Sequence, residues 1–200
     1  MTRDNPDLYA LAIMNQILGA GQFTARITNR VRAEEGLAYD AASNMTFGIY
    51  YEGTFRAHFQ SKSPTCAQAA AIVMEEVARI RNEKVSAEEL ATAINYEVEI
   101  FQRFFATPAI VAATFAADEY TRRPADYWEK YRDRLRAETA DDVLRVAQKY
   151  LQPEKLVTLA VGNVDDVLKG DPNKPQYSFE KLGKITRLAL PDPVTMEYPK

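Results

Sequence analysis

Apolar residues recur every three or four positions along most of the chain, which is the spacing of helices that bury one face. Asparagine, serine and threonine caps, three of them followed by proline at the first helical position, mark where these helices begin. The predicted starts are Asn5-Pro6, Ser63-Pro64, Ser86-Ala87-Glu88-Glu89, Thr107-Pro108 and Thr139-Ala140-Asp141-Asp142. Further helices are predicted over about residues 23–33 and 127–135, and Gly19-Ala20-Gly21 is expected to end the first helix. The pattern therefore predicts a helix-rich chain.

Three segments have the pattern of strands instead. Leu37–Phe47 and Tyr51–Gln60 alternate between apolar and polar residues and are joined near Gly48. This predicts an antiparallel hairpin with one packed face. The run Leu156–Gly162 is apolar and nearly continuous, which predicts a well-buried central strand.

The order of these elements predicts an α+β fold, with several helices packed on one face of an antiparallel or mixed sheet. Three strands make a thin sheet for so many helices, so we expect at least one further strand, contributed from upstream of Met1. Residues 1–170 are predicted to form a single domain. A linker signal at 171–175 begins residues 171–200, which are predicted to form an extended tail that wraps the surface or reaches a partner.

The composition excludes several classes of function. The chain has 200 residues, of which 46% are hydrophobic and 26% charged, as in an ordinary globular protein. A net charge of −3, with no basic run longer than Arg122-Arg123, argues against a nucleic-acid-binding face. No apolar stretch approaches the ~20 residues of a membrane helix, and residues 1–6 lack the apolar region of a signal peptide. The chain could still be part of a longer exported protein, so the compartment stays open.

A single histidine and a single cysteine limit the chemistry further. His58 lies on the polar face of a predicted strand, and we expect it to face the surface rather than to act in catalysis. Cys66 lies on the apolar stripe of a predicted helix, and no neighbour in the sequence would lower its pKa. Zinc hydrolases commonly use two or three histidines, so no metal or other cofactor is expected in this chain.

Arg32 and Tyr39 are the candidate functional residues. The pattern places Arg32 in the last turn of a helix, Gly36 at a left-handed C-cap, and Tyr39 in the strand that follows. A guanidinium and a phenol aimed into one cleft could hold a carbonyl or a developing oxyanion. The alternative is a solvated cation at a helix end beside a half-buried strand aromatic.

Three segments in order resemble the second, non-metal half of the pitrilysin/insulinase-type zinc peptidases, the superfamily that includes mitochondrial processing peptidase. The first runs from Pro6-Asp7-Leu8-Tyr9-Ala10 into Met14-Asn15-Gln16-Ile17-Leu18-Gly19-Ala20-Gly21-Gln22-Phe23-Thr24-Ala25-Arg26. The second is Arg32 through Tyr39, with Gly36-Leu37-Ala38-Tyr39 as its core, and the third is Leu159-Ala160-Val161-Gly162-Asn163. Together they cover about residues 5–165.

The resemblance implies a half of a clamshell that closes around a peptide. The other half would carry an H-x-x-E-H zinc motif, and this chain, which has no such motif, would bind no metal. By resemblance Tyr39 would donate a hydrogen bond in the transition state and Arg32 would anchor a substrate carbonyl, whereas Arg26 is expected to be structural. The family also has a strand or two before the first helix, which agrees with the missing strand. The partners implied are the zinc-binding half and a peptide, and self-association is left open.

Two other functions remain open at this stage. The chain could be a scaffold or assembly subunit of the same fold that takes no part in catalysis. It could also be an unrelated module that binds extended peptides at an open sheet edge.

Overall fold

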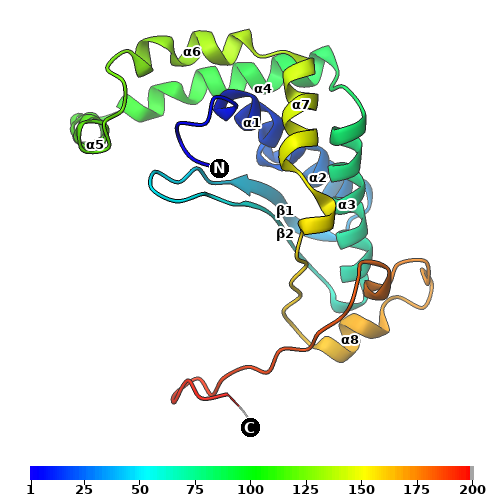
Figure 1. The fold of residues 1–200 in the computed structure, drawn as a ribbon. Coiled ribbons are helices and arrows are strands. Elements are labelled where there is room, and N and C mark those ends of the chain that lie inside the picture. The colour runs from blue at the N-terminus through cyan, green and yellow to red at the C-terminus, as the bar shows by residue number, and fades with distance from the viewer. Residues whose placement is uncertain (199–200) are drawn as a thin grey trace.

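A computed structural model describes residues 1–198, in which the helices lie along one side of a two-stranded sheet (Figure 1). The strands are β1 (Ala38–Met45) and β2 (Phe55–Ser61). The α-helices are α1 (Leu8–Asn15), α2 (Arg26–Thr28), α3 (Cys66–Asn82), α4 (Ala87–Ile100), α5 (Pro108–Tyr120), α6 (Tyr127–Ala137), α7 (Ala140–Tyr150) and α8 (Val164–Lys169). The π-helical segments are η1 (Gln16–Ala20) and η3 (Asn29–Glu34), and the 3₁₀ turns that matter below are η2 (Gln22–Thr24) and η5 (Phe101–Phe105). The predicted α+β class is confirmed.

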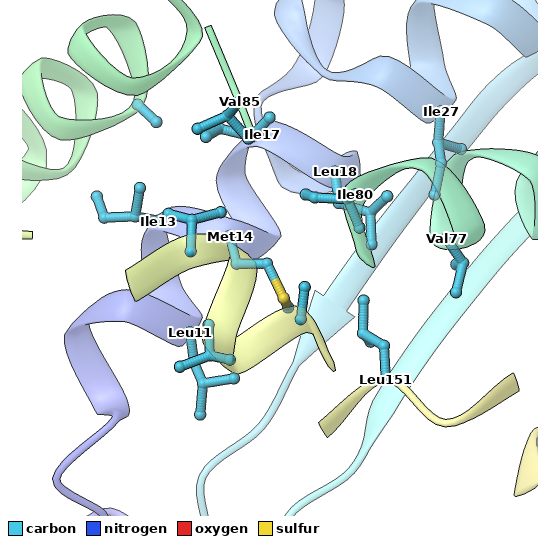
Figure 2. Packing of buried hydrophobic residues seen from close by; sticks show 14 of the residues in the cluster. Leu11, Ile13, Met14, Ile17, Leu18, Ile27, Val77, Ile80, Val85 and Leu151 are labelled. Atoms are coloured by element: carbon cyan, nitrogen blue, oxygen red, sulfur yellow. The ribbon is translucent and has the colours of Figure 1, made fainter. Parts of the chain in front are cut away.

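The core lies around α1, which packs against α7 on one side and the hairpin on the other (Figure 2). Leu11, Ile13 and Met14 in α1 have no exposed surface, and neither does Leu18 in the following η1, so this stretch is apolar nearly all round. α3 and α7 contribute the facing side chains and also contact each other. Their buried members include Ile72, Val77, Ile80, Val143 and Val146, with Leu151 just after α7.

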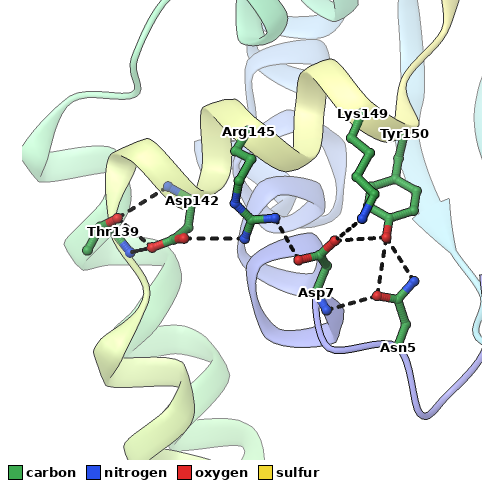
Figure 3. A network of polar contacts seen from close by, with 7 residues as sticks. All are labelled: Asn5, Asp7, Thr139, Asp142, Arg145, Lys149 and Tyr150. Atoms are coloured by element: carbon green, nitrogen blue, oxygen red, sulfur yellow. Dashed lines mark hydrogen bonds and ion pairs between the residues drawn. The ribbon is translucent and has the colours of Figure 1, made fainter.

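A polar network fastens the start of α1 to α7 (Figure 3). The carboxylate of Asp7 accepts hydrogen bonds from Arg145 at 2.6 Å, Lys149 at 2.8 Å and Tyr150 at 2.8 Å. The side chain of Asn5 accepts a hydrogen bond from the backbone N–H of Asp7 and so orders the residues that lead into α1. The helix predicted to start at Asn5-Pro6 itself begins at Leu8. Burial raises the pKa of Asp7, but the three donors outweigh it and lower the pKa to about 2.

The predicted helix caps are confirmed at three sites. Ser86 and Glu89 form a reciprocal capping box at the start of α4, and Thr139 and Asp142 form another at the start of α7. Thr107 accepts from the backbone N–H of Ile110 before the Pro108 that begins α5. The α-helix that begins after Ser86 ends at Ile100, and the chain continues as the 3₁₀ segment η5.

The helix predicted over 23–33 is wrong in its detail. A short α2 leads into η3, whose wider turns bond each N–H to the carbonyl five residues earlier, as in Glu35 to Arg30 at 3.1 Å. Gly19 also does more than stop the first helix. A Cβ there would lie 2.4 Å from the backbone nitrogen of Ser43, so glycine lets η1 approach β1 closely.

The predicted hairpin is confirmed, with corrected bounds and one irregularity. β1 and β2 pair antiparallel, with Ala41 opposite Phe59 and Met45 opposite Phe55. The register shifts by one residue between Ala38 and Ala41, which is a β-bulge. The connection is longer than expected, running from residue 46 to 54.

The buried central strand predicted at Leu156–Gly162 is wrong. The segment forms no strand in the described part of the chain, and Val157, Leu159 and Val161 are 91%, 72% and 86% exposed. In Figure 1 it runs down from α7 toward α8. Its apolar sequence suits a sheet interior, but no neighbouring strand pairs with it.

The later residues are mostly exposed. α8 contacts the turn at Ser63–Thr65, and residues 182–198 form no helix or strand. The division into a domain at 1–170 and a tail at 171–200 stays a prediction, and residues 199–200 lie outside the described part. Among residues 1–198 no single helix has the length and apolar character of a membrane span. One pair, Ala87–Phe105 with Pro108–Tyr120, passes that test only when joined, and it bends by 99° at its break.

Candidate functional site

The turn between η3 and β1 brings Arg32 toward Tyr39. Gly36 adopts φ 62°, the left-handed conformation predicted for a helix C-cap. The N–H of Leu37 donates to the carbonyl of Val31 at 2.9 Å and closes the end of the helix. This bond spans one residue more than in an α-helical Schellman motif because η3 has π geometry.

The bulge in β1 sets the direction of Tyr39. Ala38 and Ala41 are both buried, whereas Tyr39 and Asp40 between them are both exposed. Regular alternation would have put Tyr39 on the same face as Ala41, so the extra residue turns the phenol outward. Tyr39 is 82% exposed, which excludes the half-buried strand aromatic considered from the sequence.

Arg32 lies between two aromatic rings. Its guanidinium carbon is 4.4 Å from the centre of the Tyr39 ring and 4.5 Å from the centre of the Phe23 ring. Cations stack favourably on aromatic faces at such distances. Phe23 belongs to η2 and is 66% exposed, so all three side chains meet at the surface. The structure therefore brings the two predicted site residues together and adds Phe23.

Phe23 was missed because the sequence reading treated residues 23–33 as one helix. In the structure η2 is a separate turn, and it begins at Gln22 with φ 50°. The available signal was an aromatic residue directly after the glycine stop at Gly19-Ala20-Gly21. A helix interpretation places such a residue on the helix surface, with no reason to meet Arg32.

Hydrogen-bond donors of the site are left unpaired. Among residues 1–198, no carboxylate or carbonyl accepts a hydrogen bond from Arg32, and none pairs with the Tyr39 hydroxyl. The neighbouring carboxylates are engaged elsewhere: Glu34 accepts from Asn29, and Glu35 accepts from Gln68 and Lys174. The positive charge of Arg32 is consequently available to an external group.

Ion pairs behind the site hold its supporting helices. Arg30 in η3 bonds Glu76 at 2.9 Å and Glu75 at 2.8 Å on α3. Burial lowers the pKa of Arg30, but hydrogen bonds from its guanidinium to these carboxylates outweigh that effect and raise it. Arg26 bonds both oxygens of Glu89 at 2.6 and 3.0 Å. The hydrogen bond from Arg26 lowers the pKa of Glu89 to about 2 against the effect of burial.

The only histidine, His58, and the only cysteine, Cys66, are not expected to act together with Arg32 and Tyr39. His58 on β2 lies 3.7 Å from the carboxylate of Asp40 and is partly buried, more than the surface position we expected. Burial raises the pKa of the Cys66 thiol, which makes it a poor nucleophile. Arg32 and Tyr39 thus offer hydrogen-bond donors and a positive charge.

Residues 1–198 contain no group of three histidine, cysteine, aspartate or glutamate side chains arranged to hold a metal ion. The donors at the site, a guanidinium and a phenol, are unsuitable ligands for zinc at neutral pH. The described residues therefore do not fit a zinc ion.

Comparison with known families finds a match for the first part of the chain. Residues 1–96 match the family described as the peptidase M16 inactive domain. This stretch includes Phe23, Arg32, Tyr39 and the whole hairpin. No curated protein matches the sequence.

Solved structures extend the similarity to the fold. The peptidase M16 inactive domain from Pseudomonas fluorescens is 26% identical and covers 76% of this chain, with a TM-score of 0.68. The inactive peptidase domain of a provisionally assigned zinc protease from Bordetella parapertussis is 19% identical over 76% of this chain and 81% of its own, with a TM-score of 0.63. A protease from Helicobacter pylori is 18% identical over 76% of this chain, with a TM-score of 0.62. The chain spans only 36% of the Pseudomonas and Helicobacter chains.

Proposed function

We propose that this chain acts as the non-metal half of a zinc metalloendopeptidase, because residues 1–96 match the peptidase M16 inactive domain family and the fold match covers 76% of the chain. It pairs with a half that carries an H-x-x-E-H motif. An extended peptide lies between the two halves, and this chain completes the active site. The resemblance predicted from the sequence is confirmed at the level of the inactive domain, and the pairing and the peptide are the proposal.

The observation that carries the proposal is the geometry of Arg32 and Tyr39. The two side chains stack at 4.4 Å, lie at the surface, and keep their hydrogen-bond donors unpaired. A peptide backbone offers carbonyl oxygens, which are acceptors and carry no charge to repel the guanidinium. Stacking restricts the Arg32 side chain before a peptide binds, so less conformational entropy is lost on binding.

The two residues have different roles in this scheme. Arg32 holds a substrate carbonyl next to the bond to be cleaved. Tyr39 donates a hydrogen bond to the oxyanion of the tetrahedral intermediate, where the charge is greater than in the substrate. The metal bound in the partner half would supply an activated water. Because Arg32 and Tyr39 supply hydrogen-bond donors and the activated water would come from the partner half, this chain is expected to be inactive alone.

Reconstitution tests this function. Cleavage of fluorogenic peptides is measured for the chain, for the H-x-x-E-H half from the same source, and for the mixture, each with zinc and with a chelator. The proposal predicts zinc-dependent cleavage that is far faster in the mixture than with either half. Cleavage by the metal half that the chain does not accelerate, although the two form a complex, would support the scaffold function instead. Binding of extended peptides that is unaffected by the metal half would support a separate peptide-binding module.

A further inference from the structure

A polar pocket of about 400 Å³ is lined by residues of α2, η3, α3 and α4. Its charged lining consists of three arginines and three glutamates: Arg26, Arg30, Arg79, Glu34, Glu76 and Glu89. Thr24 and Asn29 complete the lining, so within the described part of the chain its walls are made of polar side chains. The volume lies in the range of small-molecule sites, and the lining suits a polar ligand.

Arg26 and Glu76 form the buried part of this lining. Arg26 is 7% exposed and Glu76 is 1% exposed, whereas Glu34 is exposed at the rim. Two nitrogens of Arg26, Nε and Nη2, donate to Glu89 at 2.6 and 3.0 Å. The third nitrogen, Nη1, is buried and has no hydrogen-bond partner among residues 1–198. The N–H groups of Nη1 therefore lack an acceptor.

Glu76 has the complementary deficiency. Its Oε1 accepts from Arg30 at 2.9 Å, but in the described part of the chain its buried Oε2 accepts no hydrogen bond. Arg79 comes within 3.8 Å of Oε2, which is too far for a hydrogen bond. Buried polar atoms without a partner are rare in native proteins, because each loses its hydration without compensation. One pocket thus contains a buried donor and a buried acceptor that both need an external partner.

The two unpaired groups lie close to each other. Arg26 and Arg30 are four residues apart, which is about one helical turn, so their side chains are neighbours on the helix surface. Arg30 in turn contacts Glu76. A single small molecule beside Arg30 can therefore reach both Nη1 of Arg26 and Oε2 of Glu76.

The charges of the lining disfavour a simple ion as the ligand. Three guanidinium groups and three carboxylates sum to zero, so the pocket has no net charge to attract either sign. An anion would pair with Arg26 but leave Oε2 of Glu76 without a donor. A cation would pair with Glu76 but leave Nη1 of Arg26 without an acceptor. A zwitterion, which carries both charges, satisfies the two groups together.

We propose that this pocket binds a free α-amino acid. The carboxylate of the ligand accepts from Nη1 of Arg26, and its ammonium group donates to Oε2 of Glu76. Both groups of the ligand are charged at pH 7. This inference does not depend on the proposed peptidase function, because Arg32 and Tyr39 do not line the pocket.

Titration of the full 200-residue chain with matched probes tests this site. Serine is the amino acid used, because the polar rim suits its small hydroxyl side chain. Ethanolamine is serine without the carboxylate, and β-hydroxypropionate is serine without the amino group. Binding is followed by NMR from the shifts of backbone amides at pH 7.

Serine is expected to give saturable shifts at residues 24–34, 76–79 and 86–89, the segments that line the pocket. Ethanolamine and β-hydroxypropionate should bind roughly tenfold or more weakly, since each lacks one of the two hydrogen bonds to a charged group.

Glu76→Gln removes the charge that the ammonium group meets, and Glu75→Gln is its matched control. Glu75 also bonds Arg30, at 2.8 Å, but it does not line the pocket. The affinity for serine should fall roughly tenfold or more in Glu76→Gln and stay within about twofold in Glu75→Gln. If Glu76→Gln does not fold, Thr24→Trp, at an exposed lining position, fills the mouth of the pocket and should also abolish binding.

Other outcomes would overturn the proposal. No saturable shift with serine would mean that ordered water alone fills the pocket. Binding of either single-charge probe as tight as that of serine would mean that only one of the two groups is recognised. An equal loss of affinity in Glu75→Gln and Glu76→Gln would mean that Arg30, rather than Oε2 of Glu76, controls binding.

Discussion

Residues 1–151 and residues 156–198 contain similar apolar runs, but only the first region buries them. Leu11, Ile13 and Met14 in α1 have no exposed surface, whereas Val157, Leu159 and Val161 are almost fully exposed. In the described part of the second region, Val167 is the one buried apolar side chain. The difference lies in the backbone: α1 forms its own hydrogen bonds, whereas an extended segment needs a neighbouring strand. An apolar run is thus buried only where its backbone groups also have partners.

The largest effect is expected when a leucine of the first region is truncated, and the same truncation in the second region should have almost none. Leu11→Ala should cost about 2–5 kcal/mol of unfolding free energy, because it leaves a cavity in a closely packed core. Leu159→Ala should change stability by less than about 0.5 kcal/mol, since its side chain is already in solvent. Urea unfolding of the two variants measures this contrast. A large loss with Leu159→Ala would mean that residues 156–162 are packed in solution.

Asp7→Asn should weaken the attachment of α1 to α7 (Figure 3). The variant keeps the shape of the side chain but loses the charge, and the expected cost is on the order of 2 kcal/mol at pH 7, allowing for the partly exposed Arg145 and Lys149.

The pH dependence of Asp7→Asn provides an internal control. The folded pKa of Asp7, about 2, lies below its ordinary value of 3.8, so its stabilisation is present above pH 3.8 and is lost as pH falls toward 2. Stability curves of the wild type and the variant should therefore converge in acid. A cost that stays constant from pH 7 to pH 2 would contradict the role of the charge.

Glu97→Gln should have a smaller effect of opposite sign. Burial between the helices raises the pKa of Glu97 from 4.5 to about 7. A carboxyl with a raised folded pKa costs stability progressively as pH rises from 4.5 through 7. The variant should therefore be more stable than the wild type by about 1–2 kcal/mol at pH 8 and nearly equal at pH 4. Thermal unfolding at pH 4 and at pH 8 measures this difference in stability. Glu99→Gln, at an exposed neighbouring position on α4, is the control.

The smallest effect is expected from Phe23→Leu. The change removes one of the two rings that hold Arg32, and such stacking at a surface contributes about 0.5–1 kcal/mol. Folding stability should stay within about 0.5 kcal/mol of the wild type, while KM for peptide in the reconstituted pair should rise a few-fold. Ile110→Leu, at an exposed position on α5, serves as a control. An unchanged KM would show that Tyr39 alone positions Arg32.

Much of the helical framework could be predicted because its signals are local. The capping boxes at Ser86 and Thr139 determine where α4 and α7 begin, whatever lies around them. The left-handed Gly36 and the sequence on either side likewise predicted the turn that joins Arg32 to Tyr39. The family resemblance rested on the same stretch, and it is confirmed over residues 1–96.

The rest depended on contacts that a single sequence does not encode locally. The bulge that turns Tyr39 outward is a property of pairing between two strands, and no residue in β1 signals it. Phe23 meets Arg32 only because the predicted helix is broken into η2, α2 and η3. Residues 156–162 have the composition of a central strand. A central strand needs neighbouring strands to pair with, and the sequence did not show whether these are present.

The most direct test of the central claim is the cleavage rate of the reconstituted pair with Tyr39→Phe. Tyr51→Phe is a matched control, because Tyr51 is also an exposed tyrosine (78%) and lies in the hairpin connection. If Tyr39 donates to the oxyanion, Tyr39→Phe should fold and pair normally but lower kcat by about 10²–10³, with Tyr51→Phe unchanged. A kcat for Tyr39→Phe equal to that of the control would contradict the claim that this chain completes the active site through Tyr39.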